Sequence, residues 1–240
     1  LALERTLLFA NQAAESGAAV QLEPSRSSDS RLLNNVWLDS ELNTAPLLCL
    51  CLTTDADTAL LAHNTFHGTE LIANTAVRLR GGETTAVNNI IAHFNVGLEA
   101  TNSAAVTTDH NLYFGLKTPE LNVAPNESNL IDEDPLFINA AQHNFRLQAE
   151  SPAVNSGKPL PDVRLDRLGL DRNQGASVDR GAYEHNQGFM PPEAIITLAC
   201  PTTGAGQLLI EAIEQANAQE GANQIELAPN CRYELEKPFP

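Results

Sequence analysis

Asn34-Asn35-Val36-Trp37 is the stretch of sequence that decides the fold, because its pattern returns along the chain. Asparagine stands beside apolar or aromatic residues in five segments: Leu7–Asn11, Leu32–Trp37, Leu61–Phe66, Ala86–Ile91 and Thr108–Phe114. Alignment on Asn11, Asn35, Asn64, Asn89 and Asn111 gives spacings of 24, 29, 25 and 22 residues. A second strand-like segment follows most of them, at residues 18–22, 48–52, 75–79 and 96–100. The chain is therefore an array of repeats.

Repeats of this length predict a solenoid. One coil of short strands and turns cannot bury its own inner face, whereas stacked coils bury a continuous core. Each strand then pairs with its counterparts above and below, and each repeated asparagine can bond to the next one in the stack. Variable spacing is expected, because turns tolerate insertions. The sequence therefore predicts an all-β fold, a right-handed parallel β-helix.

Several motifs resemble those of secreted β-helix proteins. Phe9-Ala10-Asn11-Gln12-Ala13, followed by Ser16-Gly17-Ala18, is similar to the repeat of polymorphic outer-membrane proteins, with serine in place of the first glycine of a Gly-Gly-Ala motif. Asp109–Gly115 resembles the last coil of that class. Four further motifs resemble the C-terminal segment of choice-of-anchor surface proteins: Asp134–Phe137, Phe145–Leu147, Ser151–Gly157 and Asp179–Glu184. The resemblance implies an extracellular or cell-surface β-helix.

Four regions follow from these patterns. Residues 1–130 are expected to form the coils, 131–185 a covering segment, 186–196 a linker, and 197–240 the cap helix and first coil of a following β-helix unit. Apolar residues trace one helical face within residues 206–218, and strands are predicted at 225–227 and 233–235. This end resembles a β-helix N-terminal cap, although the family's arginine before Glu211-Ala212-Ile213 is absent. Either the chain is a piece of a tandem protein, or its last segment completes a neighbouring molecule.

The charge restricts the partners. The chain has 30 acidic and 14 basic residues, for a net charge of −16, and such a surface repels the phosphates of nucleic acid. The longest apolar run, Ala45–Leu52, is too short to span a bilayer, so we expect no membrane span in this segment.

The four cysteines divide into two pairs. Cys49 and Cys51 are two residues apart, a spacing that we judge poor for a mutual disulfide, so we expect buried small hydrophobic side chains there. Cys200 and Cys231 bracket the predicted cap helix, and a disulfide between them would indicate an oxidising compartment.

No group of residues stands out as an active site, and the sequence predicts no catalytic, cofactor-binding or metal-ligating residue. Asp55 and Asp57 have the spacing of a carboxylate pair, but aspartate is favoured in turns, and a turn is what we expect. His63 and His110 each precede a repeat asparagine, but two histidines do not make a metal site.

The acidic C-terminal run has two interpretations. Asp162, Asp166, Asp171 and Asp179 could hold calcium, which prefers several oxygen ligands. Arginines are interspersed among them, which favours ion pairs instead. Those arginines are Arg164, Arg167, Arg172 and Arg180.

Two apolar columns follow the asparagines, and only one of them can face outwards. The first holds Val36, Thr65, Ile90 and Leu112, and the second holds Trp37, Phe66, Ile91 and Tyr113. An outward stripe with Trp37, Phe66 and Tyr113 could stack on sugar rings. We favour its burial under residues 131–184, because a sheet that is apolar on both faces must be covered.

Together these observations favour a non-enzymatic structural or adhesive protein, extracellular or at the cell surface, with head-to-tail assembly into filaments as an extension. Self-association or contacts with surface polysaccharides are the expected partnerships, and no cofactor is expected. The alternative is a polysaccharide-active lyase or hydrolase, or a carbohydrate-binding β-helix, which a pair of aligned carboxylates in a groove would favour.

Overall fold

The computed structural model describes most of the first 186 residues and short parts of the remainder. The described residues are 2–5, 7–10, 20–22, 29–39, 46–52, 54, 56–68, 75–186, 195–198, 211 and 224–227. The chain divides into two compact units, Leu1–Asn186 and Gln187–Pro240.

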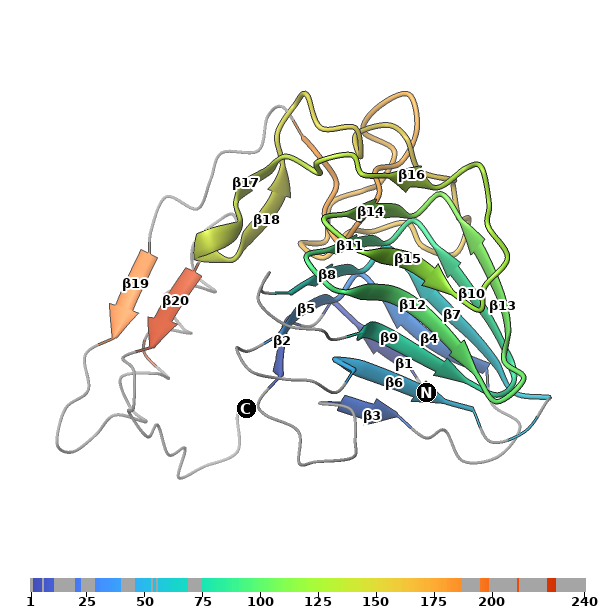
Figure 1. The fold of residues 1–240 in the computed structure, drawn as a ribbon. Coiled ribbons are helices and arrows are strands. Elements are labelled where there is room, and N and C mark those ends of the chain that lie inside the picture. The colour runs from blue at the N-terminus through green and yellow to red at the C-terminus, as the bar shows by residue number, and fades with distance from the viewer. Residues whose placement is uncertain are drawn as a thin grey trace, which may run out of the picture. The chain divides into compact units, whose positions relative to one another are not determined.

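Three parallel sheets build the first unit, and the strands of each sheet lie one above another (Figure 1). Sheet A contains β1 (Ala2–Glu4), β4 (Asp29–Leu33), β7 (Thr58–Ala62), β10 (Glu83–Val87) and β13 (Ala105–Asp109). Sheet B contains β2 (Leu7–Ala10), β5 (Val36–Asp39), β8 (Thr65–His67), β11 (Ile90–Ala92), β14 (Leu112–Phe114) and β16 (Leu130–Ile131). Sheet C contains β3 (Val20–Leu22), β6 (Leu48–Cys51), β9 (Thr75–Arg80), β12 (Val96–Thr101) and β15 (Thr118–Leu121). One strand from each sheet makes a coil, from coil 1 (β1–β3) to coil 5 (β13–β15). The predicted parallel β-helix is confirmed.

The column that starts with Trp37 fills the interior. Trp37, Phe66, Ile91 and Tyr113 are in register along sheet B and are at most 1% exposed. The rings of Trp37 and Phe66 stack with centroids 5.6 Å apart. Because Asn35 points inwards, the alternation of a strand turns Val36 outwards and Trp37 inwards. The idea of an outward stripe of these rings, available to sugars, is therefore wrong.

The asparagine ladder runs through the coils at the corner between sheets A and B. The amide nitrogens of Asn35, Asn64 and Asn89 each donate to the Oδ1 of the next asparagine, over 3.1, 3.0 and 2.9 Å. The ladder continues from Asn111 to Asn129, whose Oδ1 accepts a hydrogen bond from the Asn111 backbone N–H at 2.8 Å. Every buried amide in this corner thus has partners in the adjacent coils, which couples each coil to its neighbours.

The predicted alignment of Asn11 with this ladder is wrong. Leu7 pairs with Val36, which directly follows Asn35. Leu7–Ala10 is thus the strand β2 itself, and Asn11 comes after a strand, whereas each ladder asparagine comes before one. Asn129 is the member that the repeat spacing missed, since it lies only 18 residues after Asn111.

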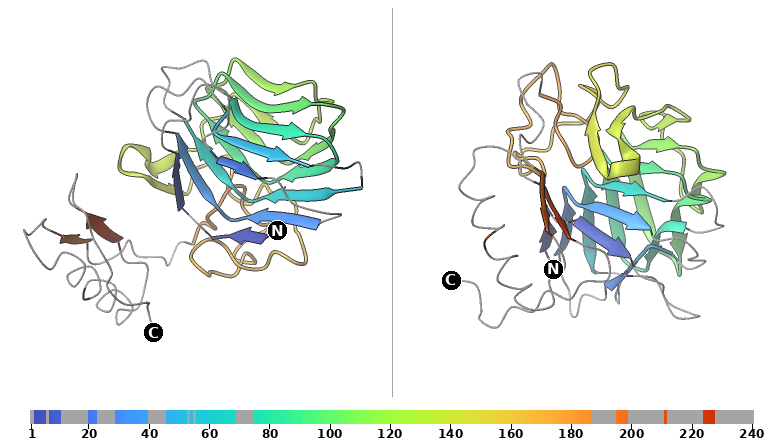
Figure 2. Two further views of the ribbon diagram at one scale, coloured as in Figure 1. Left: turned by 90° about the horizontal axis from the view of Figure 1, so that it is seen from below. Right: turned by 90° about the vertical axis from the view of Figure 1, so that its left-hand side faces the viewer.

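The segment after β16 covers the outer face of sheet B. It contains the antiparallel hairpin of β17 (Phe137–Asn139) and β18 (Asn144–Leu147), joined by the 3-10 turn η1 (Ala140–Gln142). Phe145 packs with Val36 and Leu38, and Leu147 packs with Ile90 and Leu112. Figure 2 shows this unit from two further sides. The outward apolar column of sheet B is thereby buried.

Cys49 and Cys51 form a disulfide with each other, so our expectation of two free, buried cysteines is wrong. Their Cα atoms are 5.7 Å apart, within the range that a disulfide spans. Both side chains leave strand β6 on the same face, opposite to Leu48 and Leu50, and both residues are buried. The short distance between these two Cα atoms in β6 therefore permits a disulfide, which the longer distance in an ideal extended strand disfavours.

In the second unit, β19 (Ile195–Leu198) pairs in parallel with β20 (Gln224–Leu227). The predicted strand at residues 225–227 is confirmed, whereas β19 begins within the stretch expected to be a linker. Parallel pairing of successive strands is the relation between the coils of a solenoid. Within the predicted cap helix, Glu211 is helical. The rest of that helix, Cys200, Cys231 and residues 233–235 lie outside the described residues.

Candidate functional site

A second column of polar residues stands directly before the ladder. We call Asn34, His63, Asn88 and His110 the clasp column. All four adopt left-handed backbone conformations, with φ of 57°, 54°, 57° and 50°. Asparagine and histidine are enriched in that region among residues other than glycine, which accounts for the two residue types at this position. The sharp turn points these side chains away from the ladder.

Asn88 binds the backbone of the covering segment. Its Nδ2 donates to the Lys158 carbonyl at 2.7 Å, and its Oδ1 accepts from the Lys158 N–H at 2.8 Å. The Asn88 carbonyl accepts from the Gly181 N–H at 2.7 Å. Its amide also lies 2.9 Å from Nε2 of His63, whose pKa burial and the charge of Arg172 hold well below the ordinary value. His63 is thus a neutral, structural histidine at ordinary pH.

Asn34 bonds coil 2 to two residues of the covering segment. Its Nδ2 donates to the Leu165 carbonyl at 2.9 Å, and its Oδ1 accepts from Nη2 of Arg172 at 2.8 Å. Nη1 of Arg172 lies 3.2 Å from Oε2 of Glu184, and both side chains are 1% exposed. This buried ion pair fixes the end of the covering segment against coil 2.

Burial shifts the pKa values of Arg172 and Glu184 in opposite directions, in each case towards the uncharged form. Burial lowers the pKa of Arg172, and the charges of Glu184, Asp166 and Asp179 counteract it. Burial, with the charges of Asp179 and Asp166, raises the pKa of Glu184, and the N–H of Asp179 and the charge of Arg172 offset only part of that rise. Neither charge would be stable in this place without its partner.

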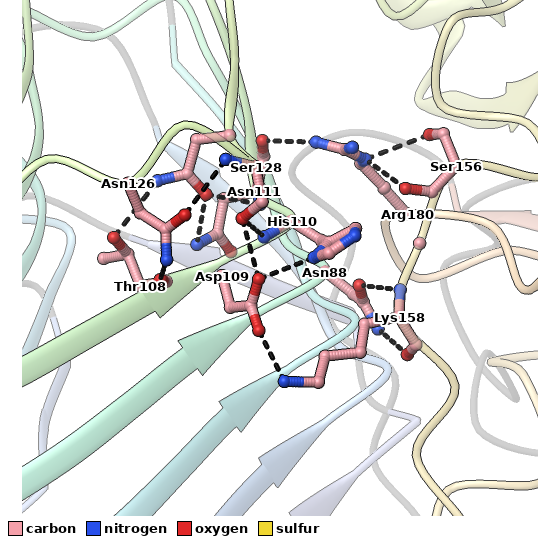
Figure 3. Close-up of polar contacts among 12 residues, drawn as sticks. Asn88, Thr108, Asp109, His110, Asn111, Asn126, Ser128, Ser156, Lys158 and Arg180 are labelled. Carbon is pink, nitrogen blue, oxygen red and sulfur yellow. Dashed lines mark hydrogen bonds and ion pairs between the residues drawn. The ribbon is translucent and has the colours of Figure 1, made fainter.

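Asp109 is the centre of a second polar cluster, at the end of β13 (Figure 3). Its Oδ1 accepts from Nδ1 of His110 at 2.6 Å and from the hydroxyl of Ser128 at 2.7 Å. Its Oδ2 lies 2.6 Å from Nζ of Lys158. Burial alone would raise the pKa of Asp109, but the bonds from Lys158, Ser128 and His110 outweigh it and hold that pKa far below its usual range. Asp109 therefore stays ionised and ties β13 to the covering segment.

Arg180 extends this cluster to the ladder. Its Nη1 donates to the Asn111 carbonyl at 2.7 Å, and its Nε donates to the carbonyl and hydroxyl of Ser156, both at 3.0 Å. Figure 3 shows the arginine between Ser156 and the ladder. Burial lowers its pKa to about 10, so it remains charged at neutral pH.

The residues singled out in the sequence have mostly structural roles. Asp57 is buried in a turn, where its Oδ2 accepts from the Thr54 N–H at 2.8 Å, and Asp55 lies outside the described residues. His63 and His110 lie in the same column, as expected, with Asn88 between them. Nδ2 of Asn126 donates to the Thr108 carbonyl at 2.6 Å.

The acidic run does not form the ion pairs that we expected with its own arginines. Asp166 accepts from the N–H groups of Leu168 and Leu170, both at 2.8 Å, and Asp179 accepts from that of Asn155 at 2.7 Å. The segment has little regular structure, so its backbone N–H groups need side-chain acceptors. The ion pair that involves this run's buried arginine goes to Glu184 instead.

Asp109, His110 and Ser128 contain the residue types of a hydrolase triad but not its connections. The Ser128 hydroxyl donates to the carboxylate of Asp109, and it accepts from the backbone N–H of His110. In a triad the histidine ring takes the proton of the nucleophile, and the acid orients the histidine. The described residues contain no group of three histidine, cysteine or acidic side chains that could hold a metal ion. The cluster holds the structure together rather than activating a nucleophile.

Comparison with known proteins adds no assignment: no family model matches the chain, and neither the curated proteins nor the solved structures include a significant match. In the part of the chain that the structure describes, no helix is long and apolar enough to cross a membrane.

Sequence reasoning missed most of this site. Lys158, Arg180 and Glu184 lie far from most of the coils in sequence, and their own positions follow no repeat spacing. The signal that was present is the residue before each ladder asparagine, because a repeated Asn or His at one position indicates a repeated left-handed turn.

Proposed function

We propose that this chain is a non-enzymatic structural or adhesive protein of the extracellular space or the cell surface. The observation that carries the proposal is the use of its buried polar groups. The ladder amides bond coil to coil, and the clasp column, Arg172 and Arg180 bond the coils to the covering segment. In the unit Leu1–Asn186 these buried polar and charged groups therefore stabilise the shape of the solenoid.

The disulfide supports a location outside the cytosol. Cys49 and Cys51 are bonded to each other, and stable disulfides belong mainly to oxidising compartments. The motifs of residues 134–184, which resemble those of choice-of-anchor surface proteins, point the same way. Their finer meaning, attachment to a cell surface, is part of the proposal.

Two measurements test the proposal. Antibodies against the purified chain should label intact, unpermeabilised cells of the source organism, and labelling only after permeabilisation would contradict the location. The purified chain should release no unsaturated or reducing sugar ends from acidic and neutral polysaccharides. Turnover that Asp109→Asn abolishes, while the exposed Lys117→Gln control retains it, would make the cluster of Asp109 an active site and overturn the non-enzymatic role.

The finer form of the proposal is head-to-tail assembly. Strand addition from residues 225–235 of one molecule to the coil edge at the Leu1 end of the next would give an open, heterologous contact, and such contacts produce filaments. Negative-stain electron microscopy of the full chain should show filaments that removal of residues 197–240 abolishes. Single particles at all concentrations would contradict assembly without affecting the structural or adhesive role.

A further inference from the structure

In coil 1 the position of the clasp column is held by an arginine whose side chain does not bond to the covering segment. Glu4 pairs with Leu33, so Arg5 occupies the place that Asn34 has in coil 2, and Arg5 too is left-handed, with φ of 53°. Its carbonyl accepts from Nη1 of Arg167 at 2.8 Å. Its guanidinium, unlike the side chains of Asn34 and Asn88, makes no hydrogen bond or ion pair with a described residue of the covering segment. In coil 1 the covering segment is therefore bonded to the Arg5 backbone and not to its side chain.

Arg5 lines a pocket of about 250 Å³. One wall comes from coils 1 and 2 and the other from the loop at residues 162–165. The residues that line it are Glu4, Arg5, Leu33, Asn34, Asp162, Val163, Arg164 and Leu165. Segments about 160 residues apart in sequence thus build one concave site, which is where small-ligand sites are usually found.

Two arginines define the electrostatics of this pocket. Arg5 and Arg164 are both exposed, and the guanidinium of Arg164 likewise has no hydrogen-bond or ion-pair partner among the described residues. Two such groups at one pocket are notable in a chain with a net charge of −16. A planar guanidinium presents paired donors that match a carboxylate or sulfate group.

The remaining lining limits the charge of a ligand. The carboxylates of Glu4 and Asp162 line the same pocket, so a densely charged polyanion would be repelled. Carboxylate oxygens accept hydrogen bonds from hydroxyls, and Leu165, which is 44% exposed, provides apolar surface for the C–H groups of a ring. One negative charge, several hydroxyls and a compact ring together describe an acidic sugar.

We infer that this pocket binds a single anionic sugar residue, a carboxylated or sulfated unit of a surface polysaccharide. The anion lies between Arg5 and Arg164, and the hydroxyls face Asp162. The inference rests on the proposed extracellular role, and it supplies that role with a class of ligand.

Isothermal titration of the full chain with a galacturonic acid disaccharide tests the inference, with the neutral galactose disaccharide and a sulfated galactose disaccharide as further arms. We expect binding of at least one anionic disaccharide and none of the neutral one. Arg164→Gln should weaken binding by on the order of ten-fold or more, the usual cost of a lost charged hydrogen bond. Lys117→Gln removes the same charge from an exposed residue away from the pocket and should leave affinity unchanged. The two anionic arms show which anion the pocket prefers.

Absence of binding by both anionic sugars, or equal binding by wild type and Arg164→Gln, overturns the inference. That result would leave surface labelling of intact cells unaffected. Conversely, labelling confined to permeabilised cells would contradict the proposed location while the titration still showed a site. The two failures are therefore distinguishable.

Discussion

The ladder and the clasp column occupy neighbouring sequence positions in coils 2 to 5, yet ladder residues bond to one another whereas clasp residues bond to other parts of the chain. Each ladder residue bonds to an identical residue in the next coil, so all of them must be asparagine: Asn35, Asn64, Asn89, Asn111 and Asn129. The clasp residues instead meet different partners: Asn34 and Asn88 bond to the covering segment, and His110 bonds to Asp109, so the position holds both asparagine and histidine. Repetition of one residue type thus marks self-stacking, and variation marks contact with a non-repeating partner.

Replacement of a central ladder residue should lower the free energy of unfolding more than replacement of its neighbour in the clasp column. Asn89→Ala removes the acceptor of the Asn64 N–H and two donated bonds, which leaves buried backbone groups without partners. We expect the free energy of unfolding to fall by about 5 kcal/mol, since each orphaned group costs roughly 1–3 kcal/mol. Asn88→Ala, its neighbour in the clasp column, should cost roughly half as much. Urea denaturation measures both, with the exposed Asn173→Ala as control, and equal losses at positions 88 and 89 would contradict the distinction.

The buried ion pair is the strongest point of the clasp. Arg172→Met leaves Glu184 buried without its partner and should lower the free energy of unfolding by about 4 kcal/mol. Arg172→Met combined with Glu184→Gln removes the stranded charge, and it should recover part of that loss. A double variant as unstable as the single one would show that the lost hydrogen bonds of Arg172 to Asn34 and Gly181, and not the stranded charge, dominate the effect.

Acid should destabilise the folded unit in part through His67, which lies against the covering hairpin. The ring of His67 lies 5.0 Å from those of Phe145 and His93, and burial, with the charges of His93 and His143, lowers its pKa to about 4. The unfolded chain therefore takes up this proton first, as pH falls through 6.5, and the folded chain only near pH 4. We expect a loss of up to about 3 kcal/mol between these values and none beyond.

Urea denaturation from pH 7 to pH 4 measures that loss, and His67→Gln should flatten the curve relative to wild type. The difference between the two curves isolates His67, because the buried carboxyls Asp179 and Glu184, with raised pKa values, oppose the trend in both proteins. Parallel curves would assign the acid sensitivity elsewhere.

The smallest change in the free energy of unfolding should come from the ion pair between Lys158 and Asp109. Lys158 is about half exposed, so its pair with Asp109 is screened by solvent despite the 2.6 Å separation. Lys158→Gln should cost less than about 1 kcal/mol, and the difference from wild type should shrink in 1 M salt. A larger loss of stability that salt does not reduce would show that Lys158, like Arg172, makes an ion pair that is shielded from solvent.

The coils could be predicted because their information is periodic. Identical asparagines at similar spacing require stacking, and Val36, Trp37 and their counterparts require a two-sided strand. Register was less certain: Asn11 resembles a ladder residue locally, and only strand pairing shows that it follows β2. The bond between Cys49 and Cys51 was also beyond reach, because it depends on the exact geometry of β6.

The site could not be predicted, because its partners are separated by long, non-repeating intervals. Asn88 meets Lys158 after 70 residues, and Asn34 meets Arg172 after 138. The charge pattern of the acidic run favoured pairs between neighbours in sequence. The folded segment instead uses its aspartates to satisfy backbone N–H groups, a demand that exists only once the loop has its final shape.

The covering segment also changes how the molecule should respond to pulling forces. A bare stack of coils holds only nearest neighbours together and can peel from an end, one coil at a time. Here residues 165–182 bond to every coil in turn, through the residues Arg5, Asn34, Thr65, Asn88 and Asn111. This lengthwise brace means that no coil can detach before the brace does. Under tension this unit should resist as one body and then unfold in a single event.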